Sequence, residues 1–133
     1  MSQENVEVAQ RAVNAWNAGD VETLAALFDS DAEFVPFRSQ LEGVVYLGPP
    51  GVRQFARDSA EEWDFLRIAD AEYRAVGDER VLILGQMEGR GRASGMDLRV
   101  PAAWVMHIRN ARIAALRAYS KYEDALEAVG LRE

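Results

Sequence analysis

The most regular pattern of apolar and polar positions runs from Met96 to Tyr119. It predicts two strands, MDLRVPAAWVMHIR and RIAALRAY, joined by a tight turn at Asn110-Ala111. Because successive strand residues point to opposite faces of a sheet, each strand can be divided by parity. One face is free of charge and comprises Leu98, Val100, Ala102, Trp104, Met106, Ile108, Ala114, Leu116 and Ala118. The other face is mixed and comprises Asp97, Arg99, Pro101, Ala103, Val105, His107, Arg109, Ile113, Ala115, Arg117 and Tyr119. The uncharged face is typical of a surface packed on helices or around an apolar cavity, and the mixed face of one exposed to water or to a partner subunit.

In the N-terminal half, apolar residues recur at steps of three and four. This spacing predicts a helix from Ser2 to about Ala18 and a shorter second helix, VETLAALF, capped by Asp20. A third helix is expected from Pro49 to about Trp63, since proline is tolerated in a first turn. Its inward stripe comprises Val52, Phe55, Ala56, Ser59 and Trp63.

Between the second and third predicted helices, DAEFVPF (31–37) predicts a short strand and residues 38–48 predict a loop. Pro36 lacks an amide donor, so this strand lies at a sheet edge or ends there. After the third helix the period changes to two, which predicts strands at 65–76 and 81–92 around a Gly77-Asp78 turn. The glycines at 85, 89, 91 and 95 indicate bulges or strong curvature.

The end of the chain predicts a short helix, DALEAV, that ends at Gly130. Ser120 and Glu123 have the spacing of a capping box at its start. Helices segregated from a run of strands predict a single α+β domain over residues 1–133. We expect three N-terminal helices on a strongly curved, mainly antiparallel sheet, with a conical space at its mouth for a small ligand.

Composition narrows the function classes. The 133 residues include no cysteine and one histidine, so we expect no disulfide, no thiolate chemistry, no metal site and no cofactor. A net charge of −7 without a basic patch argues against a nucleic-acid partner. The N-terminus has no secretory pattern, and no apolar run approaches the ~20 residues of a membrane span. We therefore expect a cytoplasmic domain without membrane contact.

Several segments resemble the SnoaL-like and ketosteroid-isomerase-like proteins of the nuclear transport factor two superfamily. They include RAVNAWNAGDVETLAALFDSDAEF, YLGPPGVRQF, GDERVLILGQ, HIRNARIAALRAY and YEDALEAVGL, so the resemblance covers nearly the whole chain. It implies a cone-like α+β fold and a homodimer packed through the outer sheet face. Because this superfamily includes isomerases, cyclases, hydratases and proteins without chemistry, it implies no single reaction.

The acid–base residues of these relatives are replaced in this chain. By resemblance, the tyrosine and the base aspartate of the isomerases fall at Ala12 and Pro36, and their second acid falls at about Trp104. The aspartate proposed as base in SnoaL-type cyclases falls at Ala118. The isomerase and cyclase mechanisms are therefore not carried over.

Four other residues are candidates for catalysis. Glu88 would reach the cavity rim as a raised-pKa base if Leu82 and Leu84 face the core, with Gln86 or Tyr46 as donor. Asp58 lies beside the stripe of the third helix. The alternatives are a solvated Glu88 paired with Arg90, an ordinary exposed charge at Asp58, and a Tyr46 that only packs on its neighbours. Parity places His107 on the mixed face, at the surface or in a dimer interface.

The candidate ligand-binding residues are Trp16, Phe34, Phe55, Trp63, Trp104, Leu116 and Ala118, which could equally form plain core. Three functions stay open. The first is a homodimeric domain that binds a small, largely apolar molecule. The second is an isomerase, cyclase or hydratase that uses Glu88 as a relocated base. The third is a structural dimer or accessory subunit without catalysis.

Overall fold

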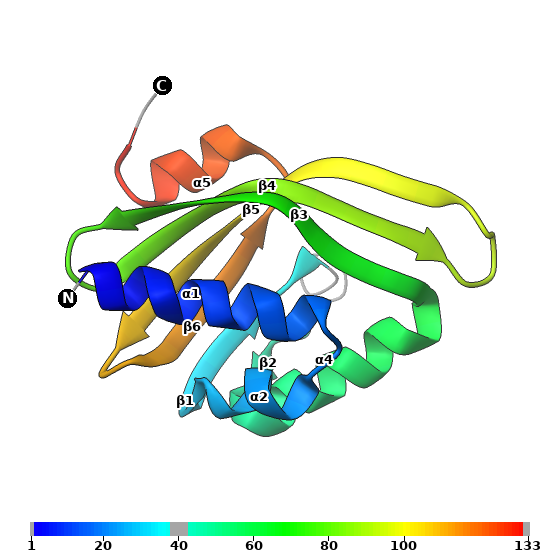
Figure 1. Ribbon diagram of the computed structural model, residues 1–133, viewed down its shortest axis with the longest axis horizontal. Helices are drawn as coiled ribbons and strands as arrows, with labels where there is room; N and C mark the ends of the chain where they lie inside the picture. Colours follow the sequence, from blue (N-terminus) through cyan, green and yellow to red (C-terminus); the bar gives the residue numbers. More distant parts are fainter. Residues whose placement is uncertain (1, 38–42, 132–133) are drawn as a thin grey trace.

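A computed structural model describes residues 2–37 and 43–131 of the chain. The helices are α1 (Ser2–Asn17), α2 (Val21–Ala26), α4 (Gly48–Glu62) and α5 (Tyr122–Ala128). The strands are β1 (Phe28–Val35), β2 (Tyr46–Leu47), β3 (Trp63–Val76), β4 (Arg80–Gly91), β5 (Asp97–Arg109) and β6 (Arg112–Tyr119). Figure 1 shows the predicted α+β arrangement, with α1, α2 and α4 on one side of a curled sheet and α5 on the other.

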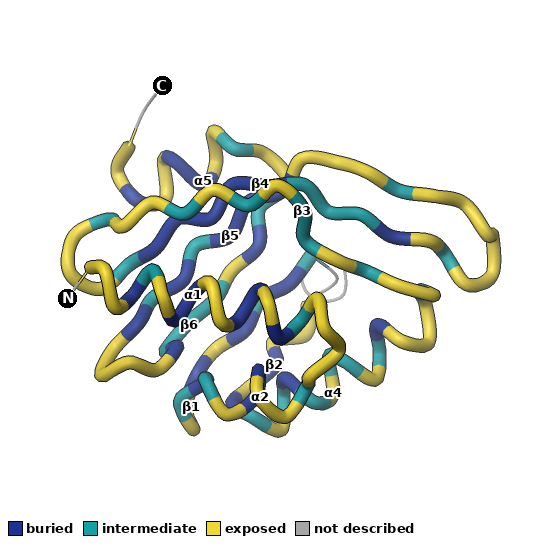
Figure 2. The backbone as a smooth tube through the Cα atoms, in the orientation of Figure 1, coloured by how far each residue is buried: buried dark blue, intermediate teal, exposed yellow. Residues whose placement is uncertain are grey.

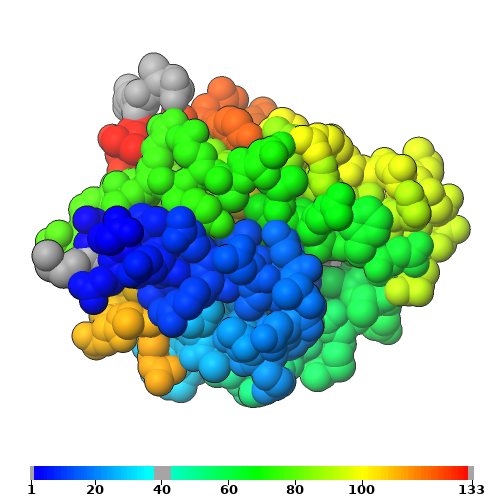
Figure 3. Space-filling view, viewed as in Figure 1, coloured from blue at the N-terminus to red at the C-terminus, as the bar shows by residue number. Residues whose placement is uncertain are grey.

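The described strands form one six-stranded sheet in the order β2-β1-β6-β5-β4-β3. β1 pairs parallel with β6 and all other neighbours pair antiparallel, which confirms the mainly antiparallel prediction. Figure 3 shows α1 and α2 covering one side of the molecule, with β3 directly above α1. None of the described helices is long and apolar enough to cross a membrane.

Apolar side chains pack on both faces of the sheet. On the inner face, Val81 and Ile83 of β4 belong to a core shared with α1 and α2. On the outer face, Leu82 and Leu84 pack with Leu126 and other residues of α5. Figure 2 shows buried residues concentrated in the central strands, whereas the tip of the β4–β5 hairpin is mostly exposed.

The long hairpin forms as predicted, with one local difference. Ile113, which parity assigned to the mixed face, is completely buried in the inner core. The register explains the error: Ile108 lies opposite Ile113, whereas His107 lies opposite Ala115. β6 therefore carries one extra residue, Ala114, and this bulge reverses the parity between Ile113 and the rest of the strand.

The first strand is shifted relative to its prediction. α2 ends at Ala26 because the Leu27 amide closes the last turn on Leu24, and Phe28 already pairs with Ile113 in β1. β1 ends at Val35, so Pro36 follows the strand. Of the two predicted alternatives, a strand at the sheet edge or a strand that ends at Pro36, the second is therefore the one observed. Of the predicted loop, residues 38–42 lie outside the described residues, and Tyr46–Leu47 form β2 instead.

The predicted capping box at Ser120 and Glu123 does not form. Lys121 occupies the N-cap of α5 and makes no side-chain cap bond. The helix is held by its first residue instead, because the Tyr122 hydroxyl donates to the Gly85 carbonyl oxygen at 2.7 Å. At α2, by contrast, the predicted cap is confirmed: the Asp20 carboxylate accepts from the Thr23 amide, and Thr23 lowers the pKa of Asp20.

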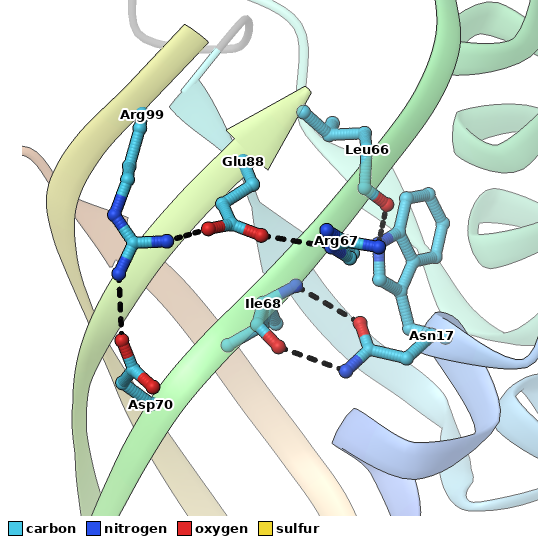
Figure 4. Close-up of polar contacts among 8 residues, drawn as sticks. Asn17, Leu66, Arg67, Ile68, Asp70, Glu88 and Arg99 are labelled. Carbon is cyan, nitrogen blue, oxygen red and sulfur yellow. Dashed lines mark hydrogen bonds and ion pairs between the residues drawn. The ribbon is translucent and has the colours of Figure 1, made fainter. Parts of the chain in front are cut away.

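β3 lies at one edge of the sheet, and α1 satisfies part of that edge. The Asn17 side chain both donates to the Ile68 carbonyl and accepts from the Ile68 amide, at 2.8 and 2.9 Å (Figure 4). The Trp16 indole donates to the Leu66 carbonyl at 2.8 Å. A bulge follows at Asp70, which has a φ of 55°. Gly85 permits it, because a Cβ there would lie 2.9 Å from the Ala69 carbonyl oxygen.

The β5–β6 turn places an alanine in the left-handed region. Asn110 and Ala111 have φ values of 53° and 62°, as a two-residue hairpin turn requires. Ala111→Gly should therefore raise the free energy of unfolding by about 1 kcal/mol, because a left-handed backbone costs alanine roughly that much. Urea unfolding measures the change. Ala93→Gly, in the turn between β4 and β5 and with an ordinary backbone, should give no gain. Equal effects of the two substitutions would contradict the assigned strain.

Candidate functional site

The inner face of the sheet and the helices enclose a cavity of about 470 Å³. Its walls come from α1, α2, α4 and every long strand of the sheet. All seven predicted ligand-binding residues line it, namely Trp16, Phe34, Phe55, Trp63, Trp104, Leu116 and Ala118. Contact between these side chains and a ligand stays a prediction.

The four positions at which relatives carry acid–base groups also meet at this cavity. Ala12, Pro36, Trp104 and Ala118 come from α1, the end of β1, β5 and β6, and all four line it. None of the four side chains carries a carboxylate or a hydroxyl, and the indole N–H of Trp104 is their one polar group. The positions to which the resemblance assigns the relatives' acid–base groups therefore lie together at one cavity but lack those groups.

Aromatic rings form two groups along the cavity. Phe55 of α4 packs against Trp16 and Phe34, with ring centroids 5.3 and 4.8 Å apart. Trp104 of β5 lies 6.5 Å from Phe37. Such rings offer large, rigid apolar surfaces, and they suit a ligand that is itself mainly apolar.

Among the described lining residues, hydroxyl and carboxyl groups come from Ser59, Glu62 and Ser120. Glu62 and Ser120 are exposed, whereas Ser59 is only 6% exposed. The sequence placed Ser59 on the inward stripe of its helix but did not mark it as a site residue. Glu62 escaped notice as well, although it follows Ser59 by one helical turn and so shares that side of α4.

Glu88 and Gln86 lie away from the cavity. The condition for Glu88 was that Leu82 and Leu84 face the inner core, but both pack on the outer face against α5. β4 pairs with β5 without a register shift, so Glu88 and Gln86 share that outer face. The expectation that Glu88 reaches the cavity rim is therefore wrong.

On the outer face, Glu88 is held between two arginines (Figure 4). Its carboxylate accepts from Arg67 Nε at 2.8 Å and pairs with Arg99, which also donates to Asp70. The partner differs from the predicted one, since Arg90 instead pairs with Asp97. The Glu88 side chain is 16% exposed, so the pair is shielded more than an ordinary surface ion pair.

Tyr46 and Asp58 are brought together. The buried Tyr46 hydroxyl donates to Asp58 Oδ2 at 2.7 Å, and the Gln54 amide donates to Oδ1 of the same carboxylate. The Tyr46 ring packs on Phe34 and Phe55. Neither Tyr46 nor Asp58 is among the described residues that line the cavity. This pair joins β2 to α4.

His107 also lies away from the cavity, as parity predicted. Its Nε2 lies 2.7 Å from Glu79 Oε1, and this hydrogen bond, reinforced by nearby Arg109, lowers the pKa of Glu79. In the part of the chain that the structure describes, no group of three or more histidine, aspartate or glutamate side chains could hold a metal ion.

Comparison with known proteins gives the same fold. The family model described as the SnoaL-like domain matches residues 9–116. Comparison with curated protein sequences finds no match.

Solved structures of the same fold are similar along nearly their whole length. A protein of Xanthomonas campestris pv. campestris, named as a candidate polyketide cyclase, has a TM-score of 0.81 at 16% identity, over 97% of this chain and 98% of that one. TerC, co-crystallised with polyporic acid, has a TM-score of 0.78 at 18% identity, over 95% and 98%. A protein of Catenulispora acidiphila with a ketosteroid-isomerase-like fold, in complex with trimethylamine, has a TM-score of 0.76 at 18% identity, over 94% and 93%. At these identities the likeness shows the fold alone.

The position of Glu88 generates a test. Glu88→Gln removes the charge between Arg67 and Arg99 and should lower the free energy of unfolding by about 1 kcal/mol at low ionic strength. The loss should shrink in concentrated salt, because salt screens the remaining arginine charges. Urea unfolding at two salt concentrations measures both effects.

Glu72→Gln is the matched control, since Glu72 pairs with Arg74 at a more exposed site and should cost less. Neither variant should alter binding of the neutral fluorescent dye Nile red in the cavity. Loss of dye binding in a folded Glu88→Gln protein would contradict the placement of Glu88 outside the cavity.

Proposed function

The chain belongs to the family of SnoaL-like domains, and we propose that it binds a small, largely apolar molecule. Because the fold of this family hosts unrelated functions, the proposal rests on the cavity. The observation that carries this proposal is an aromatic cavity of about 470 Å³ with no carboxylate or hydroxyl at any of the four family acid–base positions. Its volume lies within the usual range of ligand sites, roughly 300–1,000 Å³.

Two of the similar structures support the proposal. TerC was co-crystallised with polyporic acid, and the Catenulispora acidiphila protein was solved in complex with trimethylamine. The alternative of an enzyme with Glu88 as relocated base loses the geometric condition on which it rested, because Glu88 lies on the outer face. A purely structural role would predict that the cavity binds no ligand.

Filling the cavity tests the proposal. Leu116→Trp places an indole in the space that the ligand would occupy, and should weaken Nile red binding at least about tenfold, which is the effect of losing roughly 1.4 kcal/mol of apolar contact. Fluorescence titration measures the affinity. Leu47→Trp makes the same exchange on β2, where the side chain is 60% exposed, and should leave binding unchanged. A wild-type protein that binds neither Nile red nor other neutral aromatic probes would overturn the proposal.

We also propose that the chain forms a homodimer through the part of the outer sheet face that α5 leaves uncovered. Phe65, 39% exposed, lies there beneath the guanidinium groups of Arg67 and Arg90, 5.2 and 5.8 Å from its ring centroid. The neighbouring carboxylates of Glu88 and Asp97 give the patch both signs of charge, which suits a surface that meets its own copy across a twofold axis.

Sedimentation equilibrium tests this dimer. We expect the mass of two chains at micromolar concentration. Phe65→Glu should weaken the association at least about tenfold, because it removes the apolar ring from the interface and places a charge there. Val45→Glu changes another exposed apolar residue (47% against 39% for Phe65) beside β2, at the other end of the sheet, and should leave the association unchanged. The mass of a single chain at every concentration would contradict the proposal.

A further inference from the structure

Ser59 carries a buried hydroxyl on the wall of the cavity. The residue is 6% exposed and lies on the inward side of α4 with the fully buried Val52 and with Phe55. Within the described ranges, no residue forms a hydrogen bond with this hydroxyl. Buried polar groups are nearly always paired, and one left unpaired costs about 1–3 kcal/mol. A partner from outside the chain would remove this cost.

Its surroundings define that partner. The aromatic group of Trp16, Phe34 and Phe55 lies beside Ser59, and the ring pair of Phe37 and Trp104 provides a second apolar wall. A bound molecule therefore finds mainly apolar contacts and one buried hydroxyl. A serine hydroxyl has one donor and two acceptor lone pairs. An otherwise apolar ligand can satisfy the donor with a single accepting oxygen, such as a carbonyl oxygen.

We infer that Ser59 determines specificity by donating a hydrogen bond to a carbonyl oxygen of an otherwise apolar, aromatic ligand. This inference rests on the proposed function and deepens it by naming the ligand class. Ser120 also presents a hydroxyl to the cavity, but Ser120 is exposed. Water can therefore form hydrogen bonds with this hydroxyl, and Ser120 does not discriminate between ligands. Glu62 is exposed as well and belongs to the rim.

A second, smaller space offers a competing explanation. Ser59, Trp16 and Trp63 also line a neighbouring cavity of about 310 Å³ at the end of α4. A water molecule there could satisfy the hydroxyl without any ligand. The experiment must therefore separate a hydrogen bond to the ligand from one to water.

Two probes of the same shape make this separation. Benzophenone has two rings and one carbonyl group. In its hydrocarbon analogue 1,1-diphenylethylene, a =CH2 group replaces the carbonyl oxygen and the shape is kept. Displacement of Nile red gives the affinity of each probe for the wild-type protein, for Ser59→Ala and for Ser120→Ala. The measured quantity is the ratio of ketone affinity to hydrocarbon affinity, which cancels the apolar contacts that the probes share.

We expect this ratio to fall about five- to tenfold in Ser59→Ala and to stay at the wild-type value in Ser120→Ala. Ser59→Cys, of nearly the same size and with a weak donor, should also lower the ratio, and it serves if the alanine variant does not fold. If both probes bind and Ser59→Ala leaves the ratio unchanged, the inference is overturned. That result is expected if the hydroxyl bonds only to water. The proposed function would still stand, because the cavity would still bind apolar molecules. Failure of both probes and of Nile red to bind the wild-type protein would overturn the proposed function and the inference with it.

Discussion

The hydrogen bonds from α1 to the edge of β3 determine how the helices sit over the sheet. Asn17 pairs with both backbone groups of Ile68, as a neighbouring strand would, and Trp16 donates to the Leu66 carbonyl. An unpaired strand edge exposes donors and acceptors, and here the helix side chains occupy part of it. The same bonds fix the Trp16 ring beside Phe55, so the satisfied edge also sets one wall of the cavity.

This arrangement explains which parts of the fold the sequence predicts. The hairpin was predictable because one of its faces is free of charge, and parity then identifies most of the residues that it contributes to the wall of the cavity. The position of Glu88 was not predictable, because Val81-Leu82-Ile83-Leu84 is apolar on both faces. Both faces are in fact buried, one by the N-terminal helices and one by α5. Without alternation in the sequence, parity relates these residues to one another but cannot say which face is the inner one.

The remaining errors have local causes. Ile113 is displaced from its expected face by a single extra residue, Ala114, and a bulge of one residue leaves no trace in apolar periodicity. Ser120 failed as a cap because the Tyr122 bond to β4 fixes where α5 begins. At α5, a tertiary contact decided between helix starts that the sequence presents as nearly equal.

The four family positions illustrate how far resemblance extends. Ala12 and Ala118 are separated by most of the chain and still line one cavity, so the positions that the resemblance singled out lie together in space although none carries an acid–base group. Without those groups, the apolar walls provide an attraction that is strong but has no direction. A single buried hydroxyl adds direction, because a ligand that lacks the matching oxygen leaves the donor unpaired and forfeits part of the energy gained from the walls. On this proposal, the aromatic rings determine how tightly a ligand binds, and Ser59 determines which ligand binds and in which orientation.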